Sequence, residues 1–347
     1  MPANFASDNV SGASPEIVAA LTSAAAASAM PYGADDWTAR VEAKCAEIFE
    51  TEVAVFPVAT GTAANALALA ALTPPHGAIY CHPESHAYVD ECGAPEFYSG
   101  GAKMVTIDGA GAKIAADDLA ARLAGARPHG VHNVRPVALT LSQATEAGTA
   151  YSAGEVATLC DIAHDNGMGV HMDGARFANA IVHQGLNPAD ATWRCGVDVL
   201  SFGATKNGAL AAEAVIFFRR EFAQEFGERR KRGGHLLSKL RFISAQLDAY
   251  LSDDLWRANA RAANRAAARL ADGLKTLDGA HLVHPVEANE VFAVLPEAVI
   301  AGLEGDGFGF YRMGGAGVVR LVASFNTSDA DVDAFLAAAR HHAEQQS

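Results

Sequence analysis

The sequence predicts an α/β fold: a mostly parallel sheet flanked by helices, followed by a smaller C-terminal α+β domain. Two observations predict it. Through the middle of the chain, short apolar runs rich in β-branched residues alternate with longer stretches of helical periodicity. Such alternation is typical of parallel strands joined by crossover helices that cover both faces of the sheet. After about residue 240 the alternation stops, and a long alanine- and arginine-rich helix precedes several short strands.

The predicted elements begin with helices at residues 15–30 and 38–50. Ser14 and Pro15 support the first of these, because serine is a good N-cap and proline is favoured at the first helical position. Another helix is expected at residues 153–166. Strands are expected where short apolar runs occur, at residues 53–58, 78–81, 103–107, 136–141, 169–172 and 197–202.

One further strand, residues 212–218, follows Lys206 so closely that no crossover helix fits between them. We therefore expect this strand to run antiparallel. The C-terminal part combines two helices with three short strands, at residues 254–277, 329–342, 280–283, 290–295 and 318–323. These patterns predict two domains: residues 1–245, an N-terminal arm with the large α/β domain, and residues 246–347, the small α+β domain.

The composition is that of an ordinary globular protein and excludes several classes. Of 347 residues, 50% are hydrophobic and 19% charged, and the net charge of −14 disfavours affinity for nucleic acid or an anionic membrane. The five cysteines are widely spaced without a CxxC pair, so neither a disulfide framework nor a metal site is expected. Because the N-terminus lacks the features of a signal peptide, and no apolar stretch is long enough to span a membrane, we expect a cytoplasmic protein.

Three polar motifs follow predicted strands, where ligands gather in open α/β sheets. The first is the turn at Thr60, Gly61 and Thr62, which opens a helix. Free backbone N–H groups and two hydroxyls at a helix start can bind a phosphate group. The motif is not a P-loop, because no Gly-Lys-Ser/Thr sequence follows. The alternative is a plain strand–helix turn that is capped by threonine.

The second and third motifs place an acid and a lysine after strands. Asp173 follows an apolar strand, and a buried carboxylate needs a cation or donors such as a protonated ring nitrogen. Alternatively it caps the next helix or pairs with Arg176. Lys206 lies among small residues between two glycines, where it could bind an aldehyde covalently, although most lysines are surface groups. Phosphate turn, acid and lysine together meet the three needs of pyridoxal 5′-phosphate.

The order of these segments resembles the low-specificity L-threonine aldolases, which are fold-type-I pyridoxal-phosphate enzymes of the β-eliminating-lyase branch. The resemblance runs from Ser7 and Asp8 to Arg320. Its most specific parts are HMDGARFANA at residues 171–180 and YGADD at residues 32–36, and the turn after Ala59 and the Ser-His pair at 85–86 belong to the same pattern.

The resemblance implies a role for each matching residue. Lys206 would bind the cofactor aldehyde, and Asp173 would pair with the pyridine nitrogen. His86 would stack on the ring near the substrate hydroxyl; the alternative is a packed or exposed histidine. The phosphate would lie on the turn at residues 60–62. The substrate carboxylate would be bound by Ser7, Arg176 and Arg320, of which Arg176 would also contact the cofactor and Arg320 could instead be a surface strand residue.

The implied reaction is the retro-aldol cleavage of a β-hydroxy-α-amino acid, of the L-threonine, L-allo-threonine or L-phenylserine type, to glycine and an aldehyde, with the reverse addition. His86 is the first candidate base, since an ordinary histidine pKa of about 6.5 suits neutral pH. Alternatives are another β-eliminating lyase and a pyridoxal-phosphate carrier without catalysis. A nucleotide-binding dehydrogenase is disfavoured, because the glycine-rich run at residues 305–309 comes late and follows no clear first strand.

The family also implies a homodimer or homotetramer with active sites at the dimer interface. The basic run at residues 229–234 resembles the segment that reaches a neighbouring phosphate, although it could equally be a solvated helix end. Which cation makes that contact stays open among Lys231, Arg232, Lys239 and Arg241.

Two positions depart from the family pattern. Thr145 lies near the position where many members of the resembled family carry a second active-site histidine, and Ser324 begins the segment where another histidine is usual. These departures leave the substrate side chain and the general base undetermined.

Overall fold

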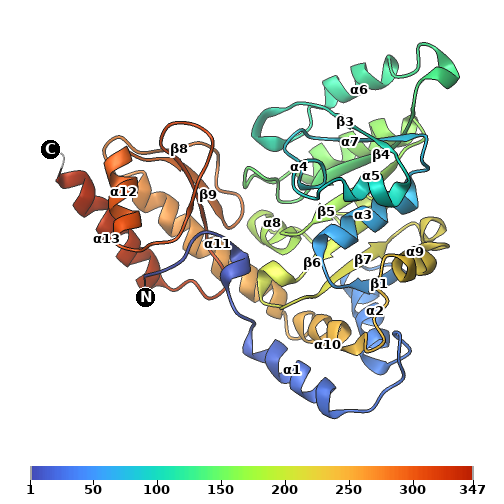
Figure 1. The fold of residues 1–347 in the computed structure, drawn as a ribbon, viewed down its shortest axis with the longest axis horizontal. Coiled ribbons are helices and arrows are strands. Elements are labelled where there is room, and N and C mark those ends of the chain that lie inside the picture. Colours follow the sequence, from blue (N-terminus) through green and yellow to red (C-terminus); the bar gives the residue numbers. More distant parts are fainter. Residues whose placement is uncertain (1, 346–347) are drawn as a thin grey trace.

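The computed structural model describes residues 2–345, which form a large sheet with helices on both faces and a smaller lobe beside it (Figure 1). The chain order of helices in the larger part is α1 Pro15–Ala26, α2 Asp36–Ile48, α3 Gly61–Leu72, α4 His86–Val89, α5 Ala94–Ser99, α6 Ala116–Ala124, α7 Ala153–Asp165, α8 Phe177–Gln184, α9 Phe226–Arg232 and α10 Arg241–Tyr250. The smaller lobe contains α12 Glu297–Gly305 and α13 Asp329–Glu344, and the long helix α11 Leu255–Leu274 joins the two parts.

The large sheet has seven strands in the order β1-β7-β6-β5-β4-β2-β3. Their bounds are β1 Ala54–Val58, β2 Gly77–Cys81, β3 Lys103–Thr106, β4 Arg135–Ser142, β5 Gly169–Gly174, β6 Val199–Gly203 and β7 Glu213–Phe217. Only β7 runs against its neighbours, as its short connection to β6 predicts. The carboxyl ends of the other six strands therefore meet at one edge of the sheet, where the three predicted motifs lie.

The smaller lobe is an antiparallel sheet of four strands in the order β10-β11-β9-β8, covered by α11, α12 and α13. Its strands are β8 His281–Leu282, β9 Glu290–Val294, β10 Tyr311–Arg312 and β11 Val318–Val322. The N-terminal segment belongs to its core: Phe5 is buried and packs edge-on against Phe335 at 5.2 Å, and its carbonyl accepts a hydrogen bond from the Val322 amide. The segment then runs back to the large sheet, so residues 7–9 lie between the two lobes, where Asp8 contacts Arg176.

Several element boundaries differ from the sequence prediction, for physical reasons. The helix predicted at 15–30 ends at Ala26. There the Arg241 guanidinium donates hydrogen bonds to the carbonyls of Ala24 and Ala27, which have no partner within the helix. Helices α4, α5, α6, α10 and α12 were not predicted; none has a side-chain cap that would mark its start. The glycine-rich run at 305–309 ends α12 in the small lobe.

The residues 2–345 include no helix with the length and apolar character needed to cross a membrane.

Candidate active site

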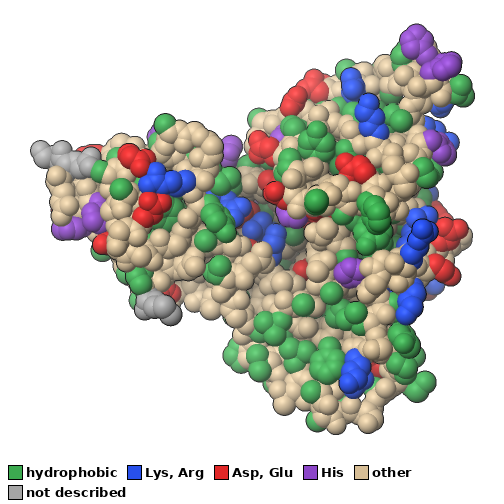
Figure 2. All heavy atoms as spheres, viewed as in Figure 1, with side chains coloured by type: hydrophobic (Ala, Val, Ile, Leu, Met, Phe, Trp, Pro, Cys, Tyr) green, Lys and Arg blue, Asp and Glu red, His purple; other side chains and the backbone are tan. Residues whose placement is uncertain are grey.

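A cavity of about 370 Å³ lies at the carboxyl edge of the large sheet. Figure 2 shows acidic and basic side chains gathered in the hollow between the two lobes. The lining comes from the N-terminal segment, the β1–α3 turn and the start of α3, α4 and the loop after it, the ends of β4 and β5, and the β6–β7 connection with the start of β7. It consists of Asn9, Ala59, Thr60, Gly61, Thr62, Asn65, His86, Glu91, Ser142, Ala144, Thr145, Glu146, Asp173, Ala175, Arg176, Thr205, Lys206, Leu210, Ala211 and Glu213.

Asp173, near the end of β5, is held by two hydrogen bonds. The Asn65 side-chain amide donates to Oδ2 over 2.7 Å, and the Ala175 backbone N–H donates to Oδ1 over 3.0 Å. The carboxylate is therefore buried and fixed in orientation, which is the condition for binding a positively charged ring nitrogen. Sequence reasoning missed Asn65. What could have indicated it is its position in the first turns of α3, directly after the turn at residues 60–62.

Lys206 lies on a short 3₁₀ turn after β6 and is half-buried. The glycines that flank it are sterically required. A Cβ on Gly203 would collide with the Ala175 carbonyl, and Gly208, at φ +107°, would collide with the Ser14 hydroxyl. Asn207 is anchored by hydrogen bonds from its amide to the Tyr250 hydroxyl and the Trp256 carbonyl. The turn is thus held rigidly from both sides, with the lysine on the cavity lining.

Glu213, the first residue of β7, lines the same cavity and was missed by sequence reasoning. It is buried opposite Gly203, and its Oε2 accepts a hydrogen bond from the Ala204 amide over 3.1 Å. Burial raises the pKa of this carboxyl to about 7, against the opposing effects of hydrogen bonds from Thr205 and Ala204 and of the Lys206 charge. No local pattern marks it, because its burial results from strand pairing.

Glu213→Gln should change how the stability of the apoprotein depends on pH. A carboxyl whose pKa is raised from about 4.3 in the unfolded chain to about 7 loses stabilisation as the pH rises between these values, up to roughly 4 kcal/mol. The glutamine of the variant does not ionise, so its free energy of unfolding does not include this decrease. Denaturant unfolding should therefore show the variant gaining on the wild type from pH 5 to pH 8, whereas exposed Glu47→Gln should show no such trend. A constant difference across this range would contradict the assignment.

The β1–α3 turn offers donors to an anion. Thr60 caps α3, and its hydroxyl accepts a hydrogen bond from the Ala63 amide over 3.1 Å. Gly61 and Thr62 occupy the first helical positions, whose N–H groups have no partner within the helix. A Cβ on Gly61 would meet no atom within 4 Å, so the space in front of this turn is open. The geometry suits a phosphate group.

His86 begins α4 and is linked to Asp173 through two further side chains. Its Nδ1 lies 2.9 Å from Glu91 Oε1, and the Asn65 amide donates to the same oxygen over 2.8 Å while also bonding Asp173. The hydrogen bond to Glu91 raises the pKa of His86 although burial opposes this. Burial first, and then the nearby Asp173, raises the pKa of Glu91. Glu91 was not predicted.

Glu146 is a third acidic group that the sequence did not single out. Its Oε1 accepts hydrogen bonds from the Ser142 hydroxyl and from the His86 backbone amide, both at 2.7 Å. Its Oε2 is buried and has no hydrogen-bond partner among residues 2–345. Burial raises the pKa of Glu146 to about 7 against these two hydrogen bonds, and the Asp173 charge adds to the increase.

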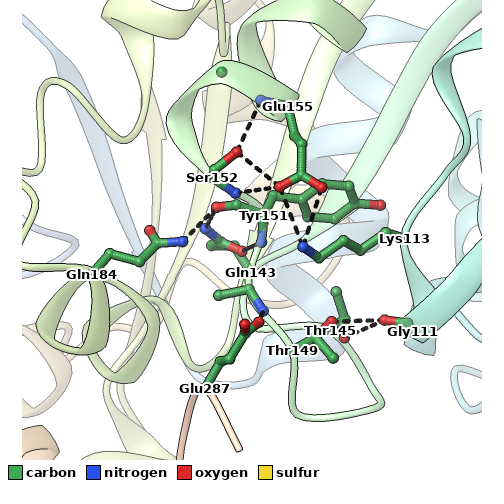
Figure 3. A network of polar contacts seen from close by, with 12 residues as sticks. Gly111, Lys113, Gln143, Thr145, Thr149, Tyr151, Ser152, Glu155, Gln184 and Glu287 are labelled. Carbon is green, nitrogen blue, oxygen red and sulfur yellow. Dashed lines mark hydrogen bonds and ion pairs between the residues drawn. The ribbon is translucent and has the colours of Figure 1, made fainter. Parts of the chain in front are cut away.

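The loop that carries Glu146 is braced by a polar network (Figure 3). Gln143 bonds the backbone of Tyr151 in both directions, at 2.8 and 2.9 Å, and the hydroxyls of Thr145 and Thr149 contact each other and the Gly111 carbonyl. Thr145 therefore has a structural role in this loop. The neighbouring residue, Glu146, is a titratable side chain that lines the cavity.

Arg176 lies where β5 leads into α8, and its charge is compensated within the chain. Its Nε and Nη2 donate to both oxygens of Asp8, at 2.8 and 3.1 Å, and Nη1 lies 3.3 Å from Glu290 Oε2. Burial opposes the ionised form of Arg176, but Asp8 and Glu290 outweigh it and raise its pKa. Asn289 holds Asp8 from the other side over 3.0 Å. The N-terminal segment is thereby attached to the site.

The structure leaves Ser7 and Arg320 outside the cavity lining. Ser7 caps a short 3₁₀ turn by accepting a hydrogen bond from the Asn9 amide. Arg320, on β11, stacks over the Tyr311 ring. Its Nη2 donates a hydrogen bond to the Ala6 carbonyl over 3.1 Å, so β11 is joined to the N-terminal segment that carries Ser7. Its Nε is buried with no hydrogen-bond partner in the described part of the chain.

The four candidate cations near the basic run have different surroundings. Arg241 is buried and bonds the end of α1. Lys231 lies over the Tyr32 ring at 4.9 Å, Arg232 lines a separate surface pocket, and Lys239 is exposed. Within residues 2–345, no group of three or more His, Cys, Asp and Glu side chains is arranged to bind a metal ion.

Comparison with known proteins decides the family. The family model described as beta-eliminating lyase matches residues 4–298. The chain belongs to the beta-eliminating lyase family. It is 40% identical over 328 residues to the low specificity L-threonine aldolase of Pseudomonas sp. (strain NCIMB 10558), covering 94% of each chain. It is 42% identical over 323 residues to the enzyme of the same name from Pseudomonas aeruginosa, covering 93% of each.

The structural comparison agrees. The Leishmania major threonine aldolase structure superposes with a TM-score of 0.92 at 26% identity, over 99% of this chain and 100% of that one. The predicted fold class, that of fold-type-I enzymes, is confirmed. In this beta-eliminating lyase, the predicted residues 60–62, His86, Asp173, Arg176 and Lys206 line one cavity. The lining residues that sequence reasoning missed include Asn65, Glu91, Glu146 and Glu213.

Proposed function

We propose that this protein is a pyridoxal 5′-phosphate-dependent L-threonine aldolase. It cleaves β-hydroxy-α-amino acids of the L-threonine, L-allo-threonine or L-phenylserine type to glycine and an aldehyde, and it catalyses the reverse addition. The observation that carries the proposal is the convergence of Lys206, Asp173 and the turn at residues 60–62 on one cavity. The identity of about 40% with two low specificity L-threonine aldolases, over nearly the whole chain, supports the substrate class.

The residues present fit the cofactor. The open first turn of α3 would bind its phosphate, Lys206 its aldehyde, and the fixed carboxylate of Asp173 its ring nitrogen. When bound, the cofactor supplies an electron sink for the pair released at the substrate Cα. The chain contributes the orientation of that sink, because Asn65 and Ala175 restrain Asp173.

The substrate carboxylate is proposed to bind beside the N-terminal segment, at Ser7, Arg176 and Arg320. Support comes from the buried Nε of Arg320, which lacks a hydrogen-bond partner among residues 2–345 and is a strong donor to a carboxylate. Arg176 already binds Asp8 through two nitrogens, so its contribution would be to orient the segment that carries Ser7 and to add positive charge.

His86 is proposed to stack on the cofactor ring near the substrate hydroxyl. Its Nδ1 contact with Glu91 supports a fixed ring orientation. The same contact raises the pKa of His86, so the protonated form persists to higher pH than in an isolated histidine. Because its pKa is raised, a smaller fraction of His86 is in the neutral, proton-accepting form at a given pH, which is a reason to consider a second group for the proton of the substrate hydroxyl.

The test is a product assay of the purified, cofactor-loaded protein with L-threonine, L-allo-threonine, L-phenylserine and L-cysteine. Glycine and the matching aldehyde should form in equal amounts from at least one hydroxy amino acid. Pyruvate without glycine would instead indicate another β-eliminating lyase. Near-visible absorbance of the cofactor without turnover of any substrate would indicate a carrier.

We further propose a homodimer or homotetramer in the cytoplasm, with active sites at the dimer interface. Support comes from the surface beside the basic run. Phe97 is 78% exposed, and it lines a surface pocket together with Tyr98 and Arg232. Large exposed aromatic side chains next to cations are typical of protein–protein contacts.

A further inference from the structure

The cavity contains a carboxyl group that neither cofactor binding nor the predicted substrate contacts use. Glu146 follows β4, and its two oxygens have different surroundings. Oε1 accepts hydrogen bonds from the Ser142 hydroxyl and the His86 amide, both at 2.7 Å, whereas Oε2 is buried and has no hydrogen-bond partner among residues 2–345. Since Glu146 also lines the cavity, a substrate hydroxyl would give this oxygen the partner it lacks.

The other acids of the cavity are less suited to exchange a proton with a substrate. Both oxygens of Asp173 already accept hydrogen bonds. Glu91 also has a free oxygen, but its carboxylate is bound to His86 and Asn65 and its side chain is fully buried. Glu213 lies on the Lys206 side and bonds the Ala204 amide. Glu146 is bound only by neutral donors, so its proton is not shared with a cation.

We propose that Glu146 is a catalytic residue whose Oε2 accepts the proton of the substrate β-hydroxyl group. The proposal rests on the proposed aldolase function and assigns the general base within it. It places that base next to His86, whose backbone amide is bonded to the other oxygen of the same carboxylate. The titratable residue is thus supplied by position 146, beside the structural Thr145.

The step balances without another reactant. The O–H bond of the β-hydroxyl breaks, its proton goes to Glu146 Oε2, and its electron pair forms the second C–O bond of the aldehyde. The Cα–Cβ bond breaks, and its electron pair remains with Cα. Protonation of Cα then gives glycine, so the overall reaction consumes no proton. In the reverse addition, protonated Glu146 returns the proton to the new hydroxyl group.

The surroundings of Glu146 determine the pH dependence. Burial raises its pKa to about 7; the Ser142 and His86 hydrogen bonds oppose this, and Asp173 adds to it. The negative charge of its carboxylate also contributes to raising the pKa of Arg176, Cys81 and Tyr151. The ionised form accepts the proton, so kcat/KM for cleavage should rise with pH through about 7. The aldol addition needs the protonated form and should fall over the same range.

Glu146→Gln tests the proposal, because the amide oxygen can still accept both hydrogen bonds while the ionisation is lost. We expect wild-type cofactor absorbance and wild-type exchange of the glycine α-proton with solvent, since neither involves a β-hydroxyl group. Cleavage should fall about 100-fold or more, and its rise through pH 7 should disappear. Glu146→Asp keeps a carboxyl group and should retain the pH rise with reduced kcat.

Two further variants separate a catalytic role from a positioning role. Ser142→Ala removes one hydrogen bond to the ionised carboxylate, so the rise in the cleavage profile should shift to higher pH. His86→Asn should lower activity but leave the rise through about pH 7 in place.

The proposal would be overturned if Glu146→Gln kept its turnover within threefold and its pH rise, or if it lost cofactor binding and glycine exchange together with cleavage. A wild-type protein that cleaves none of the hydroxy amino acids would instead remove the proposed function.

Discussion

Lys206→Ala should lose at least about 10³-fold in glycine formation, because the substitution removes the amine proposed to link the chain covalently to the cofactor aldehyde. In the wild type, borohydride reduction should fix the cofactor on the peptide that contains Lys206. We expect the label on this lysine because the turn that carries it is rigid. Gly203 and Gly208 have no room for a Cβ, and Asn207 is hydrogen-bonded to Tyr250 and Trp256. Absorbance in the near-visible region, peptide mass and turnover measure the effect.

The matched control is Lys103→Ala, which removes an exposed lysine at the start of β3. This variant should keep the cofactor absorbance, the borohydride label on Lys206 and the full activity. A Lys206→Ala protein with unchanged turnover, or a label found on another lysine, would remove the basis of the cofactor assignment.

Asp173→Asn should reduce kcat by about 100-fold or more. The buried carboxylate is the negative charge proposed to keep the cofactor ring nitrogen protonated, and loss of a preorganised charge in an active site has effects of this size. The substitution preserves the shape of the side chain and an oxygen for the Ala175 amide, so the fold should persist. Steady-state kinetics and cofactor titration by absorbance measure the change.

Asp165→Asn is the control, because it removes an exposed carboxylate at the end of α7. Its kcat should match the wild type. Near-wild-type turnover of Asp173→Asn would show that this carboxylate does not support the electron sink, and a restored kcat at lower pH would show that the nitrogen can be protonated from solvent.

Much of the site could be predicted because its chemistry follows local patterns at strand ends. The turn at residues 60–62, Asp173 and Lys206 each come directly after an apolar run, and parallel strands bring such positions to one edge. The antiparallel direction of β7 also followed from one local fact, the short connection after Lys206. Helices α6 and α10 could not be predicted so readily, since neither has a side-chain cap that marks its start.

The contacts that adjust the site are not local. The Asn65–Asp173 hydrogen bond joins residues 108 positions apart, and the Asp8–Arg176 pair joins residues 168 apart. No sequence period reports such a pairing. For this reason Asn65 was missed, and Arg176 was assigned a substrate carboxylate although Asp8 and Glu290 already surround it.

The sequence by itself determined the fold class and the kinds of group that the site contains, because hydrophobic periodicity and strand-end motifs are properties of short segments. Only the tertiary structure decided how those groups ionise. Glu146 and Glu213 look like ordinary acids in the sequence, yet burial raises the pKa of each to about 7. Desolvation depends on every segment that packs around a carboxyl group, and these segments meet only in the folded chain.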